Sequence, residues 1–192
     1  MTLYSVALFL HILGALLLFT ALSLEGIGLR QMRRASTPDQ VRDAAGIAGL
    51  ARIVGPASLV GIAVPGLYMT ATTWGWVPWI VIGLASWLLV GVTGAVNGIR
   101  LASIGRAPGG QPLSAELSAR IGDPLLVTLW LMRSAIVLAV VFLMTIKPGT
   151  AAALLVVVAA AAIGLFASLP TWRRGRASDR SHADVSTDSR SA

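Results

Sequence analysis

The sequence predicts an all-α, polytopic membrane protein: a bundle of five transmembrane helices over residues 1–171. The first observation is composition, because 56% of the 192 residues are hydrophobic and only 12% are charged. Soluble domains carry about twice that charged fraction. The second is that the chain contains five apolar segments, each close to the roughly 20 residues that cross the hydrocarbon core of a bilayer. The mean hydropathy of +0.80 agrees with this class.

The first predicted span covers residues 3–25 and ends at Glu25. No basic residues precede it, so we expect a retained helix and not a cleaved signal peptide. Thr37, Pro38 and Gln40 then form a helix start, with a capping threonine, a proline in the first turn and a capping-box glutamine. We expect this helix to lie along the membrane surface before a second span over residues 53–73, which Pro56 and Pro65 should bend.

The remaining spans are predicted over residues 79–101, 124–146 and 150–169. A tryptophan-rich segment, residues 74–79, should turn in the headgroup layer, where indole rings prefer to lie. A short helix is expected from Ser114, and Asp123-Pro124 marks the start of the fourth span. Lys147-Pro148-Gly149 forms a turn before the fifth. Residues 172–192 are polar, and we expect a disordered cytoplasmic tail.

The arginines predict the orientation of the bundle. Five spans place three arginine groups on one side, namely those at 30, 33, 34, 42 and 52, those at 100, 106 and 120, and those at 173, 174, 176, 180 and 190. Because positive loops stay in the cytoplasm, we expect the N-terminus outside and the C-terminus inside. The net charge of +7 therefore indicates topology and lipid contact, not nucleic-acid binding.

A bacterial cell (plasma) membrane is the expected location. The chain has 14 arginines against one lysine and is rich in alanine and glycine, which is typical of GC-rich bacterial genomes. The lipid bilayer is the expected partner. Gly94 and Gly98 form a GxxxG unit in the third span, which permits close helix packing. We expect packing within the chain, with a homo-oligomer through these two glycines as the alternative.

His11 is the candidate cofactor ligand. It lies about 12 Å along the first span, and Met69 and Met144 fall toward the same outer side. A haem or copper site would use these three residues. One intramembrane histidine is too few for a bis-histidine haem, so the alternative is a hydrogen bond to a neighbouring helix. On this basis we expect no bound cofactor. The chain contains no cysteine, so it has no thiolate ligand for a metal.

Four further polar residues, Glu25, Arg52, Asn97 and Arg133, are predicted to lie in or at the edge of the membrane. Such residues usually face the bundle interior and bind a partner. Arg133 lies about 14 Å into the fourth span, where Asn97 is the expected partner and Glu25 the alternative. For Glu25 we expect an ion pair with Arg52, and a proton relay from His11 is the alternative. Arg133 could instead hold an anionic substrate.

The stretch Leu10-His11-Ile12-Leu13-Gly14-Ala15 resembles the opening of a set of small bacterial membrane proteins. With residues 65–69, 74–76 and 79–80, it is most similar to an uncharacterised family of predicted integral membrane proteins, a domain of unknown function. More distantly, it resembles the CopD copper-resistance proteins and the HemJ protoporphyrinogen oxidases. The resemblance covers roughly residues 3–145 and implies a helical membrane fold, with His11 as the haem-associated histidine. HemJ proteins also use an intramembrane lysine, whereas Lys147 lies in a predicted turn.

The sequence contains no nucleotide-binding, zinc-protease or nucleophile-elbow motif. We therefore expect a membrane protein without enzymatic activity, acting as a small-molecule or proton pathway or as an accessory subunit. The alternative is a haem- or copper-dependent membrane redox protein that uses His11.

Overall fold

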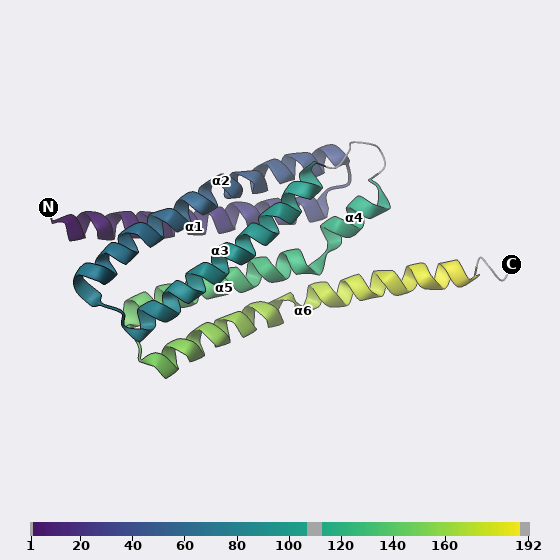
Figure 1. Cartoon of the computed structure of the whole chain (residues 1–192). Helices are drawn as coiled ribbons and strands as arrows, with labels where there is room; N and C mark the ends of the chain where they lie inside the picture. Colours follow the sequence, from purple (N-terminus) through teal and green to yellow (C-terminus); the bar gives the residue numbers. More distant parts are fainter. Residues whose placement is uncertain (1, 107–112, 189–192) are drawn as a thin grey trace.

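The computed structural model describes residues 2–106 and 113–188, and every long element in this part of the chain is a helix. Five helical segments are long and apolar enough to cross a membrane. The predicted all-α class, with five helices suitable as membrane spans, is therefore confirmed. In chain order, these five segments run alternately toward opposite ends of the bundle (Figure 1).

Helices α1 (Leu3–Arg34) and α2 (Pro38–Met69) form an antiparallel hairpin. Thr37 caps α2, because its hydroxyl accepts a hydrogen bond from the Gln40 amide at 3.3 Å. The expected surface helix before the second span is wrong, since α2 is one continuous helix packed along α1. Small residues permit this contact: a Cβ on Gly28 would lie 2.8 Å from the Ala44 carbonyl oxygen. A short π-helical turn, η1 (Thr70–Trp74), follows α2.

The second half of the chain contains α3 (Pro78–Gly105), α4 (Ala115–Gly122), α5 (Pro124–Ile146) and α6 (Thr150–Asp188). Ser114 caps α4 and Asp123 caps α5, as the sequence predicts. Lys147 ends α5 in the left-handed conformation, with φ 53°. Helix α6 packs on α5 and α3. Its backbone is helical to Asp188. The expected disorder of the tail, residues 172–192, stays a prediction.

The two ends of the bundle differ in composition. One end holds the α1–α2 connection, α4 and the C-terminal part of α6, whereas the N-terminus, η1 and the α5–α6 turn lie at the other (Figure 1). The first end therefore gathers the arginines at 30, 33 and 34, those at 100, 106 and 120, and the helical segment that carries those at 173–180, and we call it the arginine end. Arg190 lies outside the described residues. At the opposite end, the Lys147 ammonium lies 3.9 Å from the centre of the Trp74 ring.

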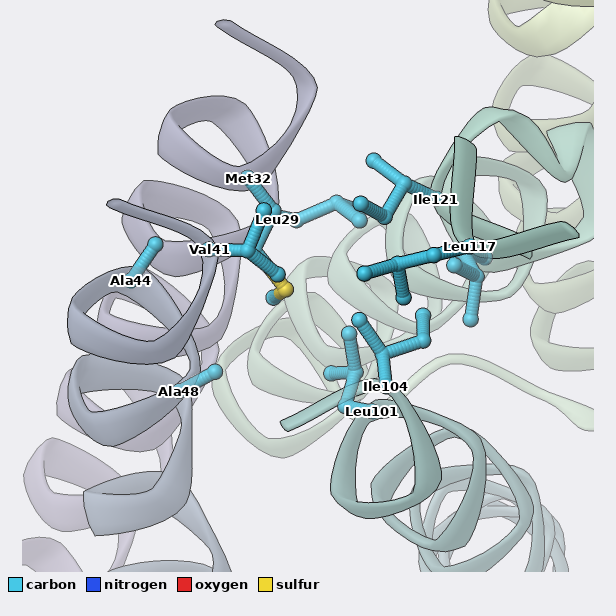
Figure 2. Packing of buried hydrophobic residues seen from close by; sticks show 10 residues of the cluster. Leu29, Met32, Val41, Ala44, Ala48, Leu101, Ile104, Leu117 and Ile121 are labelled. Atoms are coloured by element: carbon cyan, nitrogen blue, oxygen red, sulfur yellow. The ribbon is translucent and has the colours of Figure 1, made fainter. Parts of the chain in front are cut away.

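A cluster of buried apolar side chains closes the arginine end. Figure 2 shows α4 contributing Leu117 and Ile121 to it, opposite Met32 from α1 and Leu101 from α3. A second cluster lies deeper and includes Leu18, Val90 and Ile136. Many other large apolar side chains are exposed, which is the arrangement expected where lipid and not water surrounds the helices.

Candidate functional site

Three polar side chains meet inside the bundle, one from each of three helices. Glu25 of α1, Asn97 of α3 and Arg133 of α5 are only 7%, 0% and 4% exposed. Arg133 Nη2 donates to Glu25 Oε2. Asn97 Nδ2 donates to the other carboxylate oxygen, Oε1, at 2.5 Å and to the Leu126 carbonyl oxygen at 3.3 Å. We call these three residues the polar cluster.

Glycines on the facing helices make room for the polar cluster. A Cβ on Gly94 of α3 would lie 2.5 Å from Arg133 Nη1, so a larger residue there would displace the guanidinium. On α1, a Cβ on Gly26 would lie 2.4 Å from the Trp130 ring. That indole donates from Nε1 to the Leu22 carbonyl oxygen at 2.8 Å. The helices that carry the cluster therefore approach one another closely at these glycines.

The charges in the polar cluster are matched, but two of its polar atoms have no partner. Both Glu25 carboxylate oxygens accept hydrogen bonds. Within the described part of the chain, Asn97 Oδ1 and Arg133 Nε are buried without a hydrogen-bond partner. An unpaired charge in a low-dielectric interior is far more costly than an unpaired amide oxygen. The cluster therefore pairs both of its charges and leaves only two less costly polar atoms without a partner. Its hydrogen bonds also hold α1, α3 and α5 relative to one another.

Of the predicted intramembrane polar residues, the structure brings together Glu25, Asn97 and Arg133. The alternative partner, Glu25, is the one that binds Arg133, whereas the expected partner, Asn97, donates to Glu25 and to the Leu126 carbonyl oxygen. The expected Glu25–Arg52 ion pair is wrong, since among the described residues the only ion pair of Glu25 is with Arg133. Arg52 is exposed on α2, and its Cγ lies 3.7 Å from the Cβ position of Gly98. Its long side chain allows the guanidinium to extend toward the aqueous end.

His11 makes a hydrogen bond to a neighbouring helix. Its Nδ1 lies 2.8 Å from the Ile62 carbonyl oxygen of α2, and the ring packs on Gly66. Because a carbonyl only accepts, Nδ1 carries the proton and Nε2 is the basic nitrogen. The described residues contain no group of three or more His, Cys, Asp or Glu side chains that could hold a metal. Of the two candidate methionines, Met69 is buried and the Met144 methyl group lies against Gly83.

A second polar network at the arginine end was not predicted from the sequence. Asp123 accepts from the Leu125 amide at 2.8 Å and from Arg100 Nη1 at 2.7 Å, so one carboxylate both caps α5 and binds α3. Arg33 of α1 donates to the Gly122 and Asp123 carbonyl oxygens at 2.9 and 3.1 Å. The cap was visible in the sequence as Asp123-Pro124, but nothing in the spacing indicated which arginines would reach it.

Comparisons with family models, with curated proteins and with solved structures found no match for this chain. Its description as a multi-pass membrane protein depends on the five apolar helices themselves.

Proposed function

We propose that the chain is a non-enzymatic accessory subunit of a bacterial cell membrane, inserted with its N-terminus outside and its C-terminus in the cytoplasm. The observation that carries this proposal is the closed state of the polar cluster. Arg133 and Glu25 bind each other, so neither presents a free charge to a substrate. A subunit that supports a partner needs a rigid bundle, and an ion pair that joins α1 to α5 supplies one.

The orientation follows from the arginine end. Arginines remain on the cytoplasmic side of membranes because the insertion machinery and the membrane potential oppose their transfer. The α1–α2 connection and the segment around α4 both lie at that end (Figure 1). Placing this end in the cytoplasm leaves the Trp74 turn and Lys147 at the outer surface, where indole and ammonium groups anchor well.

A proton pathway is the competing role, and liposomes test it. The purified protein would be reconstituted with a pH-sensitive dye enclosed, and a pH gradient then applied. We expect no proton flux above that of protein-free liposomes, and no difference in Glu25→Gln. Flux that disappears in Glu25→Gln would overturn the accessory role in favour of a proton pathway.

The accessory role also predicts a partner. Native gel electrophoresis of gently solubilised source membranes should show the chain in a complex of defined size, larger than the purified protein migrates alone. The chain migrating only at its purified size would contradict the proposal.

A second candidate, a haem- or copper-dependent redox protein, is favoured by the geometry of His11. Metal-bound histidines usually donate their other ring nitrogen to a carbonyl or carboxylate, as Nδ1 does here to Ile62. The first-span resemblance to CopD and HemJ proteins points to the same residue. His11 is the one histidine of this kind among the described residues, which contain no group of three or more His, Cys, Asp or Glu side chains.

A visible spectrum and a metal analysis of the detergent-purified protein separate the two candidates. The accessory role predicts a colourless, metal-free preparation. A Soret band or stoichiometric copper that His11→Ala removes would favour the redox protein.

A further inference from the structure

An open groove lies between α5 and α6 on the outside of the bundle. Its volume is about 350 Å³, at the lower end of the volumes typical of ligand pockets. Side chains from both helices line it, namely Thr128, Leu165, Ser168, Leu169, Trp172 and Arg173. It is separate from the polar cluster, and neither candidate function uses it.

The polar groups in the groove wall bind one another, so the groove presents an apolar surface. The Ser168 hydroxyl donates to the Leu165 carbonyl oxygen at 2.7 Å. The Thr128 hydroxyl donates to the Pro124 carbonyl oxygen at 2.9 Å and accepts from Trp172 Nε1 at 3.0 Å. The indole thereby joins α6 to α5 at one end of the groove. A ligand for this surface must be mainly hydrocarbon, because few polar atoms remain to bind it.

The surroundings of the groove are those of a lipid-facing surface. The Thr150–Arg173 part of α6 contains the most apolar stretch among the five candidate spans of the described residues. Leu165 and Leu169 in the groove wall are 47% and 45% exposed, and Phe166 beside them is 69% exposed. A bilayer around α6 therefore puts acyl chains directly against the opening. The span ends at Arg173, whose exposed side chain lines the same groove at the arginine end.

We propose that this groove binds one anionic phospholipid, with an acyl chain between α5 and α6 and the phosphate on Arg173. Hydrocarbon matches the leucine wall, and the negative headgroup matches the guanidinium at the rim. Trp172 lies beside Arg173, at the level where indole rings favour the headgroup layer. The proposed ligand is a constituent of the bilayer, so it reaches the site by lateral diffusion.

Native mass spectrometry of the detergent-purified protein tests the proposal, with phosphatidylglycerol or phosphatidylcholine added at equal concentration. We expect one phosphatidylglycerol to be retained in preference to phosphatidylcholine. Arg173→Gln should lower that preference roughly fivefold, the effect of removing one arginine near a membrane surface. Arg30→Gln is the matched control, because Arg30 is exposed at the same end but does not line the groove.

A second pair of variants tests the acyl-chain part of the site. Leu165→Trp fills the groove and should reduce retention of both lipids, whereas Leu155→Trp, on a part of α6 away from the groove, should not. Circular dichroism checks that each variant is folded. Equal losses in Arg173→Gln and Arg30→Gln, or equal retention of the two lipids by the unmodified protein, would overturn the proposal and indicate diffuse surface contact.

Discussion

Removing one charge of the polar cluster should destabilise the bundle more than removing both. In Glu25→Gln, the Arg133 guanidinium stays buried and loses its counter-ion. Breaking a buried pair in this way costs about 3–5 kcal/mol of unfolding free energy. We expect the lower end, about 3 kcal/mol, because the glutamine oxygen still accepts a hydrogen bond.

Arg133→Met should cost less than Glu25→Gln. It leaves the Glu25 carboxylate without its cation, but Asn97 still donates to one oxygen. A carboxylate can also become neutral by binding a proton, whereas a guanidinium keeps its charge. The double variant buries no net charge, and we expect it to lie within about 1.5 kcal/mol of the unmodified protein. The two changes should therefore be coupled by at least about 2 kcal/mol.

Unfolding by sodium dodecyl sulfate measures these free energies, with the fluorescence of the six tryptophans as the signal. Arg120→Met and Glu116→Gln, singly and together, provide the control, since this pair at 2.6 Å is exposed on α4. Exposed pairs contribute about 0.2–1 kcal/mol, so the control coupling should be small. Strictly additive effects of Glu25→Gln and Arg133→Met would refute the reasoning.

Three further predictions, with one control substitution, test contacts between helices by the same unfolding assay. Gly28→Ala should cost about 1–3 kcal/mol, because its Cβ would press on the Ala44 carbonyl. Gly49→Ala, which meets open space, should instead stabilise the protein by about 0.5–1 kcal/mol. Similar effects at both positions would contradict the close contact of α1 with α2 at Gly28. Asp123→Ala removes both the α5 cap and the link to α3, and should lower the unfolding free energy by about 1–2 kcal/mol. A loss of unfolding free energy under about 0.3 kcal/mol would argue against a capping role. Trp130→Phe loses the indole hydrogen bond to α1 and should cost about 1 kcal/mol, whereas no loss would show that this bond is dispensable.

The spans and helix starts could be predicted because they depend on local sequence. Hydrophobic length fixes where a chain can cross a bilayer, and Thr37 and Asp123 cap helices through atoms two or three residues away. The need of Arg133 for an interior partner was also predictable, because hydrocarbon offers an arginine no alternative. These features require no knowledge of how the helices are rotated.

Contacts between helices could not be predicted, because they depend on rotation and close approach. Arg52 and Arg133 were both plausible partners for Glu25 by depth, and the structure selects Arg133 because Gly94 leaves room for its guanidinium. Gly28 permits α2 to pack along α1 over its full length, which composition alone did not indicate. A glycine contact of this kind is visible in sequence only once the facing helix is known.

Cysteine labelling measures the orientation of the bundle most directly, since the natural chain contains no cysteine. Ser36→Cys lies in the α1–α2 connection at the arginine end, and Gly149→Cys lies in the turn before α6 at the opposite end. In intact cells, a membrane-impermeant maleimide should label Gly149→Cys and should reach Ser36→Cys only after the membrane is permeabilised. The reverse pattern, or labelling of both positions from outside, would contradict an arginine end in the cytoplasm.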